Sequence, residues 1–153
     1  LKSGLLPYGE VRELAEDDLT LYRNDSYEHI STTAFTRVAN TNSPWLQDFN
    51  IGEQHEVVFS HGEGKVVGLN INKFKHLVAF QYSDSDGNAT LNGRFNANGS
   101  VLATEGLVSE DGLILGKMGH SERYGATLYK TNTIKVKQDI FKNGVNYFKG
   151  GKK

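Results

Sequence analysis

The sequence predicts an all-β protein, a jelly-roll-like antiparallel β-sandwich preceded by a short helical or extended N-terminal arm. Three observations support this prediction. Gly and Asn supply 30 of the 153 residues and Pro only 2, a balance typical of turn-rich proteins. Short segments rich in β-branched and aromatic residues recur about every 8–12 residues. Many of them are separated by Asn-Gly or Asp-Gly, which tolerate the positive φ angles of tight hairpin turns.

The length of 153 residues suits one folding domain, and a hydrophobic share of 37% is enough for a buried core. We expect residues 1–22 to form an N-terminal arm or stem remnant and residues 23–153 to form a β-sandwich knob domain. No apolar run approaches the ~18 residues that a transmembrane helix needs, so no transmembrane segment is predicted. The chain starts at Leu1 without a visible signal peptide, so we expect a mature product or an excised domain.

The N-terminal arm has two interpretations. Pro7 precedes an acidic stretch in which Val11, Leu14 and Leu21 share helical spacing, with Asp18 interrupting the stripe. A short local helix or extended arm fits this pattern, because Pro and acidic residues favour the first turn of a helix. The same spacing is found at the end of a coiled-coil stem, so this alternative stays open.

The remaining chain predicts strands joined by tight turns. The strand candidates are 29–38, 55–60, 65–71, 76–82, 89–95, 100–107, 113–115, 125–129, 133–141 and 145–148. In the ninth candidate, apolar and charged residues alternate with the period of two that a half-buried strand requires. The expected turn dipeptides are Asp86-Gly87, Asn92-Gly93 (a turn or a bulge), Asn98-Gly99, Asp111-Gly112 and Asn143-Gly144.

Charge is distributed unevenly along the chain. The net charge is −1, yet residues 1–28 carry a net −4 and residues 130–153 a net +6. A nearly neutral total argues against a generic nucleic-acid binder, and no nucleic-acid partner is expected. The basic end either complements the acidic start across the surface or meets an anionic surface ligand.

The sequence does not indicate catalytic or metal chemistry. It contains no Cys, which excludes disulfides, a thiolate nucleophile within the chain and Cys-based zinc sites. His55 and His61 would lie about 20 Å apart on one strand, too far to share a metal ion. We therefore expect no catalytic residues, no metal and no cofactor. Asp84-Ser-Asp86 resembles the start of a calcium loop, but Phe95 stands where the final Glu is needed, so a turn is predicted and a weak Ca²⁺ site stays open.

Ligand binding is the expected role of the loops. Sugar recognition uses an exposed aromatic plane for stacking, with acidic, amide and guanidinium groups that bind hydroxyls. The loop residues that offer these groups are predicted to bind ligand: Trp45, Tyr82, Asp84, Asp86, Asn88, Arg123 and Tyr124.

The Gly/Asn-rich segment from Asp84 to Val101 resembles the distal domains of tailed-phage tail fibres, tailspikes and tail needles. That resemblance implies a homotrimer in which Val11, Leu14 and Leu21 end a stem and the β domain forms a knob. It also implies a viral protein for host attachment, located in the virion tail or outside the cell.

The leading hypothesis is a non-enzymatic knob that binds a cell-surface glycan as host receptor, with weak sites multiplied by three copies. Three alternatives stay open. A monomeric carbohydrate-binding module or lectin has the same sandwich without the trimer. A small β-fold polysaccharide hydrolase or lyase would place its acids in a cleft. A structural capsid or tail component would bury a large interface and bind no ligand.

Overall fold

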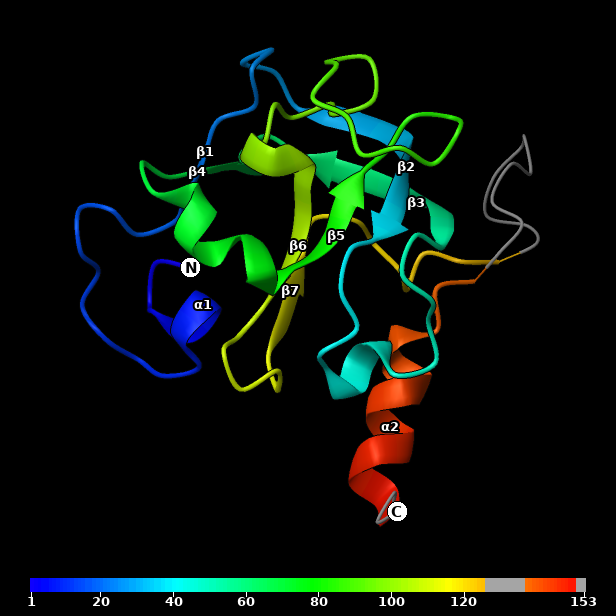
Figure 1. Ribbon diagram of the computed structural model, residues 1–153. Helices are drawn as coiled ribbons and strands as arrows, with labels where there is room; N and C mark the ends of the chain where they lie inside the picture. Colours follow the sequence, from blue (N-terminus) through cyan, green and yellow to red (C-terminus); the bar gives the residue numbers. More distant parts are fainter. Residues whose placement is uncertain (126–136, 151–153) are drawn as a thin grey trace.

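The computed structural model describes residues 1–125 and 137–150 and centres on a strongly curled antiparallel sheet (Figure 1). Short 3-10 helices (η) and two α-helices surround this sheet. The elements, in chain order, are α1 (Leu5–Tyr8), β1 (Thr20–Tyr22), β2 (Ile30–Val38), η1 (Pro44–Leu46), β3 (Gln54–His61), β4 (Lys65–Val67), η2 (Ile71–Leu77), β5 (Val78–Tyr82), η3 (Val101–Ala103), β6 (Thr104–Val108), β7 (Leu115–Lys117) and α2 (Ile140–Gly150).

The five-stranded sheet has the order β3-β2-β5-β6-β7, and β1 pairs separately with β4. Its longest ladder joins β2 to β3, from Ile30 opposite His61 to Arg37 opposite Gln54. After β7 the chain crosses to the opposite edge of the sheet, where His120 forms an isolated bridge with Val58 of β3. The two edge strands are thereby linked through residues 118–120, and the sheet curls nearly into a closed barrel.

The central strands are buried on both faces. Every residue of β6 is buried, and in β5 only Gln81 is partly exposed. Strands covered on both faces have near-continuous apolar runs rather than strict alternation, because each face packs against another layer. The larger core cluster lies between the sheet, η1, η2 and the start of α2, and includes Leu46, Phe74 and Ile140.

The prediction of an all-β jelly-roll sandwich is wrong. The structure is a small α/β domain with a curled five-stranded antiparallel sheet, a separate two-stranded pair of β1 and β4, and helices. The main physical cause lies at residues 140–150, which form helix α2 instead of strands. Asn143 and Gly144, predicted as a hairpin turn, lie inside this helix, because Gly144 packs directly on Trp45 where a side chain would not fit.

The other strand candidates match the observed elements to different degrees. The candidates 29–38 and 76–82 contain β2 and β5, and the candidate 55–60 lies within β3. Asp111-Gly112 forms the turn between β6 and β7 as predicted. Residues 89–95 contribute only one isolated bridge at Ala89, because hydrogen bonds at Asn92 close a local turn instead. The candidate 125–129 and most of 133–141 lie outside the described residues.

The N-terminal segment does not form the expected helical stripe. Helix α1 ends at Tyr8, and Val11 is 77% exposed in irregular backbone. Asp18 is buried and accepts a hydrogen bond from the Tyr8 hydroxyl, and burial together with this bond raises the pKa of Tyr8 to about 12. The polar residue that interrupted the stripe therefore has a local partner. The domain boundary after residue 22 stays a prediction.

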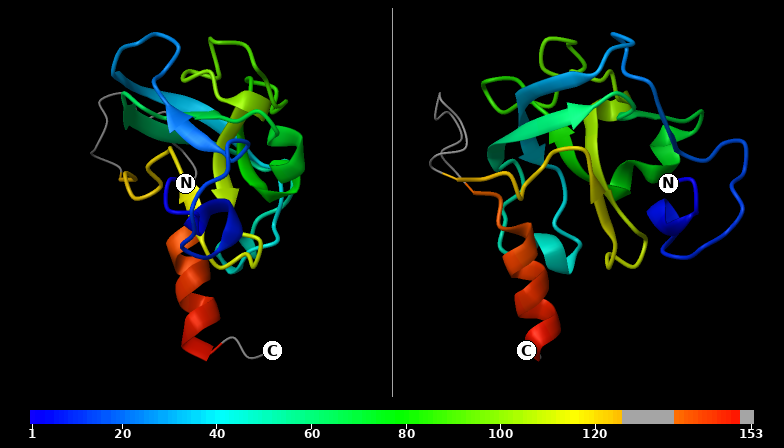
Figure 2. Two further views of the ribbon diagram at one scale, coloured as in Figure 1. Left: turned by 90° about the vertical axis from the view of Figure 1, so that its left-hand side faces the viewer. Right: turned by 180° about the vertical axis from the view of Figure 1, so that it is seen from behind.

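Helix α2 extends away from one end of the sheet (Figure 2). It contacts η1, where the aromatic rings of Trp45 and Phe148 lie 6.1 Å apart. Within the ranges described above, no helix combines the length and apolar character needed to cross a bilayer.

Candidate functional site

A histidine and a carboxylate pair lies on the turn that follows β7. His120 and Glu122 occupy the first and third positions of a turn that the Arg123 amide closes on the His120 carbonyl at 3.2 Å. The turn brings both side chains to the same side, and His120 Nδ1 lies 2.6 Å from Glu122 Oε1. The pair is solvent-accessible, with the His120 side chain 29% exposed and that of Glu122 55% exposed.

The charge on Glu122 fixes the tautomer of His120. Burial opposes ionisation of Glu122, but hydrogen bonds from its own backbone amide and from His120 outweigh it, so the pKa of this carboxyl lies below its usual range. An ionised carboxylate only accepts hydrogen bonds, so Nδ1 of His120 must donate. In the neutral imidazole Nε2 then carries the lone pair, which suits His120 to act as a general base.

Two contacts hold the turn in place. The His120 amide donates to the Val58 carbonyl of β3 at 2.8 Å. The buried Ser121 hydroxyl donates to Gln138 Oε1 at 2.5 Å, which ties the turn to the segment that leads into α2. The ring of His120 therefore projects from backbone fixed on both sides.

A cavity of about 300 Å³ lies beside the pair, between the end of β7 and α2. This volume is at the lower end of the range for small-molecule sites. Its lining includes His120 and Glu122 on one side and Trp45, Ile140 and Phe141 on the other. The arrangement offers a positioned base beside a partly apolar hollow that suits a small polar molecule with an aliphatic stem.

The pair supplies a base and its orienting group, which are two of the three parts of nucleophilic acyl transfer. The third part, a nucleophile, has no thiol candidate because the chain has no cysteine. Among the described side chains there is no group of three or more His, Asp or Glu residues suited to hold a metal ion.

The structure places only part of the predicted ligand-binding set near this cavity. Trp45 lines it, and Arg123 and Tyr124 line a smaller hollow that also reaches His120. Tyr82 is fully buried, and its hydroxyl accepts a hydrogen bond from Asn98.

The predicted residues between 84 and 88 lie on a turn outside both linings. Asp84 Oδ1 accepts the backbone amides of Asp86 and Asn88 at 3.0 and 2.8 Å, so this carboxylate closes the turn. A ligand-binding role for the predicted set stays a prediction.

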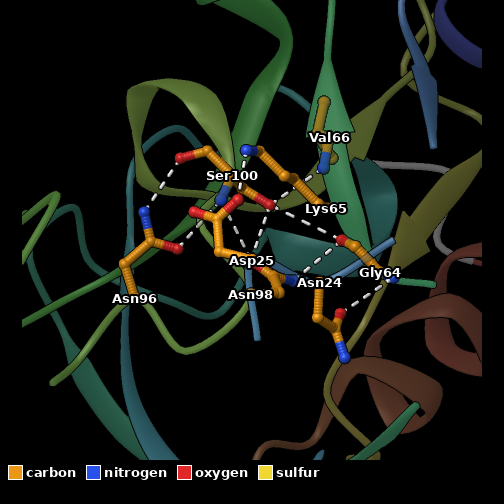
Figure 3. Close-up of polar contacts among 8 residues, drawn as sticks. All are labelled: Asn24, Asp25, Gly64, Lys65, Val66, Asn96, Asn98 and Ser100. Atoms are coloured by element: carbon orange, nitrogen blue, oxygen red, sulfur yellow. Dashed lines mark hydrogen bonds and ion pairs between the residues drawn. The ribbon is translucent and has the colours of Figure 1, made fainter. Parts of the chain in front are cut away.

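The Asn98-Gly99-Ser100 segment, predicted as a hairpin tip, is instead a buried polar cluster that fastens the loop to β4 (Figure 3). Asn98 Nδ2 donates to the Gly64 carbonyl at 2.8 Å, and the Val66 amide donates to Ser100 Oγ at 3.0 Å. Gly99 has φ +80°, and an added Cβ would lie 1.8 Å from a carboxylate oxygen of Asp25. These groups satisfy one another, so the cluster is structural.

Sequence patterns alone did not single out His120 and Glu122. The five histidines are scattered, and their spacing does not suggest a shared site. The usable signal was a His and a Glu two residues apart in the turn region between the predicted strands 113–115 and 125–129.

The comparisons with known proteins identify the family of this chain. The family described as the CobB/CobQ-like glutamine amidotransferase domain matches residues 1–148. Among curated proteins, phosphoribosylformylglycinamidine synthase subunit PurQ of Thermomicrobium roseum is 34% identical over 110 residues, covering 67% of this chain and 44% of that protein. The same subunit of Pseudothermotoga lettingae is 32% identical over 122 residues, covering 80% of this chain and 47% of the relative. The chain thus spans about half the length of these relatives.

A solved structure supports the fold. A chain in the structure of PurLQS from Thermotoga maritima superposes with a TM-score of 0.63 at 23% identity, covering 86% of this chain and 53% of that chain. The curled sheet and its helices therefore match a fold found in that assembly.

These findings overturn the functional predictions. The resemblance to phage fibres rested on Gly/Asn-rich turns, which this α/β domain also contains, and it is wrong. The predictions of a non-enzymatic glycan-binding knob, a homotrimer and a location in the virion tail or outside the cell are wrong as well, because the matching family is a glutamine amidotransferase domain and the relatives are subunits of phosphoribosylformylglycinamidine synthase. Since the match extends over residues 1–148, this chain belongs to the CobB/CobQ-like glutamine amidotransferase domain family.

Proposed function

We propose that this chain carries the base and orienting carboxylate of a site that hydrolyses the side-chain amide of glutamine. The observation that carries the proposal is the hydrogen bond between His120 and Glu122 beside a cavity of about 300 Å³. Family membership and the PurQ relatives support glutamine as the substrate. By the same likeness, the released ammonia would serve a phosphoribosylformylglycinamidine synthase of which this chain is a part.

The chemistry assigns a role to each group of the pair. A nucleophile attacks the amide carbonyl carbon of glutamine, and His120 Nε2 accepts the proton that the nucleophile loses. His120 then gives this proton to the departing nitrogen, which leaves as ammonia, and water releases glutamate from the acyl intermediate. Glu122 keeps Nδ1 protonated and stabilises the imidazolium formed between these steps.

The nucleophile is not a thiol of this chain, because the chain holds no cysteine. A thiol partner for His120 would have to come from another stretch of polypeptide, on the same protein or on a second one. The assay therefore uses the smallest native assembly that contains this chain and releases ammonia from glutamine.

Two substitutions in that assembly test the proposal. His120→Ala should lower kcat for ammonia release by about 10²–10⁴-fold, the usual contribution of a general acid-base group. Glu122→Gln should lower kcat at least about 10-fold, because the amide does not hold Nδ1 protonated in the same way. His76→Ala is a matched control, since His76 faces Glu110 at 3.3 Å as an exposed pair outside the cavity lining. Parental turnover in His120→Ala would refute the proposal.

A further inference from the structure

A buried ion pair lies directly beneath the turn that carries His120. Glu105 is the second residue of β6, and Lys117 is the last residue of β7. Lys117 Nζ lies 3.2 Å from Glu105 Oε1, and the two side chains are 8% and 0% exposed. Such burial is rare for either residue type, so this pair calls for a physical explanation.

Both charged groups also contact the backbone that leads into the turn. The Gly119 amide donates to Glu105 Oε1 at 2.6 Å, and Lys117 Nζ donates to the Gly119 carbonyl at 2.9 Å. The Met118 amide donates to the Glu105 carbonyl at 3.0 Å, which extends the pairing of β6 and β7 by one residue. The peptide groups on both sides of Gly119 are therefore fixed, and the next residue is His120.

Stability alone is a weak reason for such a pair. Removing two charges from water costs several kcal/mol for each ion, so apolar residues of similar volume are often at least as stabilising. Here Lys117 Nζ lies 5.3 Å from the centre of the Phe80 ring, and Glu105 Oε2 is buried without a hydrogen-bond partner among residues 1–125 and 137–150. Hydrogen bonds within the protein therefore replace only part of the water that these charged groups lose on burial, whereas their hydrogen bonds to Gly119 are short.

The geometry points to Glu105 and Lys117 as positioning residues that set the place of His120 relative to the reacting amide. This inference rests on the proposed function, because it assigns the pair an effect on turnover through His120. Neither side chain needs to touch substrate for this role. A displacement of about 1 Å at a catalytic group can cost about 10²-fold in rate. Holding the Gly119 peptide in place is therefore enough to affect turnover through His120.

The decisive variant removes both charges together. Glu105→Leu with Lys117→Met keeps an apolar interior and leaves no unpaired charge, so the variant should fold. Its melting temperature should be somewhat lower than that of the parent, because the buried Gly119 amide loses its acceptor. The variant lacks both contacts with Gly119, so kcat for ammonia release should fall about 10–100-fold while KM changes less than about threefold. In a His120→Ala background the same double change should cause no further loss.

A second variant and a control complete the experiment. Glu105→Gln with Lys117→Met retains an acceptor for the Gly119 amide, so its kcat should lie between those of the parent and the Leu/Met variant. The control removes the ion pair of Asp25 and Lys65 by Asp25→Asn with Lys65→Met, and neither of these side chains lines the cavity. This control should leave kcat at the parental value.

The outcomes separate the inference from the proposed function. A folded Leu/Met variant with parental kcat overturns the positioning role, even when His120→Ala is inactive. If the Leu/Met variant fails to fold, parental kcat in the Gln/Met variant overturns it equally. Parental turnover in His120→Ala overturns the proposed function itself, and the positioning role with it.

Discussion

Gly119 should not tolerate even the smallest side chain, because the space beside its α-carbon is already filled. An added Cβ would lie 2.7 Å from Val57 Cγ2, 2.9 Å from Glu105 Oε1 and 3.0 Å from Lys117 Nζ. The closest of these contacts is about 0.7 Å shorter than the 3.4 Å at which ordinary contact begins. The neighbours cannot move away freely, since Val57 lies in a ladder and the two charged groups hold each other.

We therefore expect Gly119→Ala to displace the peptide that precedes His120 by several tenths of an ångström. Overpacking of this kind costs about 1–3 kcal/mol of stability. A shift of several tenths of an ångström at the base should lower kcat by about 10-fold, since a misplacement of about 1 Å can cost about 100-fold.

Ammonia release from glutamine and urea denaturation measure these two effects on the same variant. Gly62→Ala is the control, because an added Cβ there meets no heavy atom within 4 Å. The steric reasoning would be refuted if Gly119→Ala had both parental kcat and parental unfolding free energy. A loss of stability with full kcat would show that the turn repacks without moving the base.

Three further predictions concern stability. Burial holds the pKa of His55 below its usual value despite the nearby Glu53 carboxylate, so the unfolded chain binds a proton that the folded chain resists. The unfolding free energy should therefore fall as the pH decreases below about 6.5. His55→Gln should reduce the slope of unfolding free energy against pH, measured by urea titrations between about pH 7 and pH 5, and an unchanged slope would contradict a lowered pKa of His55. Ser100→Ala leaves the buried Val66 amide without its acceptor and should cost about 1–3 kcal/mol by urea denaturation, whereas the exposed Ser31→Ala should be nearly neutral. Tyr8→Phe removes a donor to the buried Asp18 carboxylate and should cost about 1.5–3 kcal/mol at neutral pH, with the exposed Tyr22→Phe as comparison; equal stability of the two variants would argue against that hydrogen bond.

The sequence predicted those strands whose pairing depends on neighbouring segments. β2 and β3 are rich in β-branched and aromatic residues and pair with each other along eight residue positions. Asp111-Gly112 closes the β6–β7 turn with Gly112 at φ +72°. In these cases the local residue pattern and the turn residues favour the same structure, so the local sequence alone predicts the strands and the turn.

The C-terminal helix was mistaken for strands for a reason that is visible in its residues. Asn143-Gly144 has the composition of a hairpin turn, and Val145 and Phe148 resemble a short strand after it. The same stretch places Phe141, Val145 and Phe148 at helical spacing, and all three line the hollow beside Trp45. Gly144 is there because the Trp45 ring occupies the position of a side chain. Tertiary contact, which no local pattern reveals, decided between the two structures.

The site was missed because its parts were expected within one sequence motif. A general base needs hydrogen-bond geometry, and its partners arrive from wherever the fold places them. His120 is held by the hydrogen bond from its backbone amide to β3, by the Glu122 carboxylate and by backbone that β6 and β7 fix. The absence of cysteine excluded one nucleophile from this chain and said nothing about the base. A His and a Glu two residues apart after an edge strand of a curled sheet can thus form a catalytic pair when neighbouring elements hold their backbone in place. Whether the same chain contains a nucleophile does not decide this.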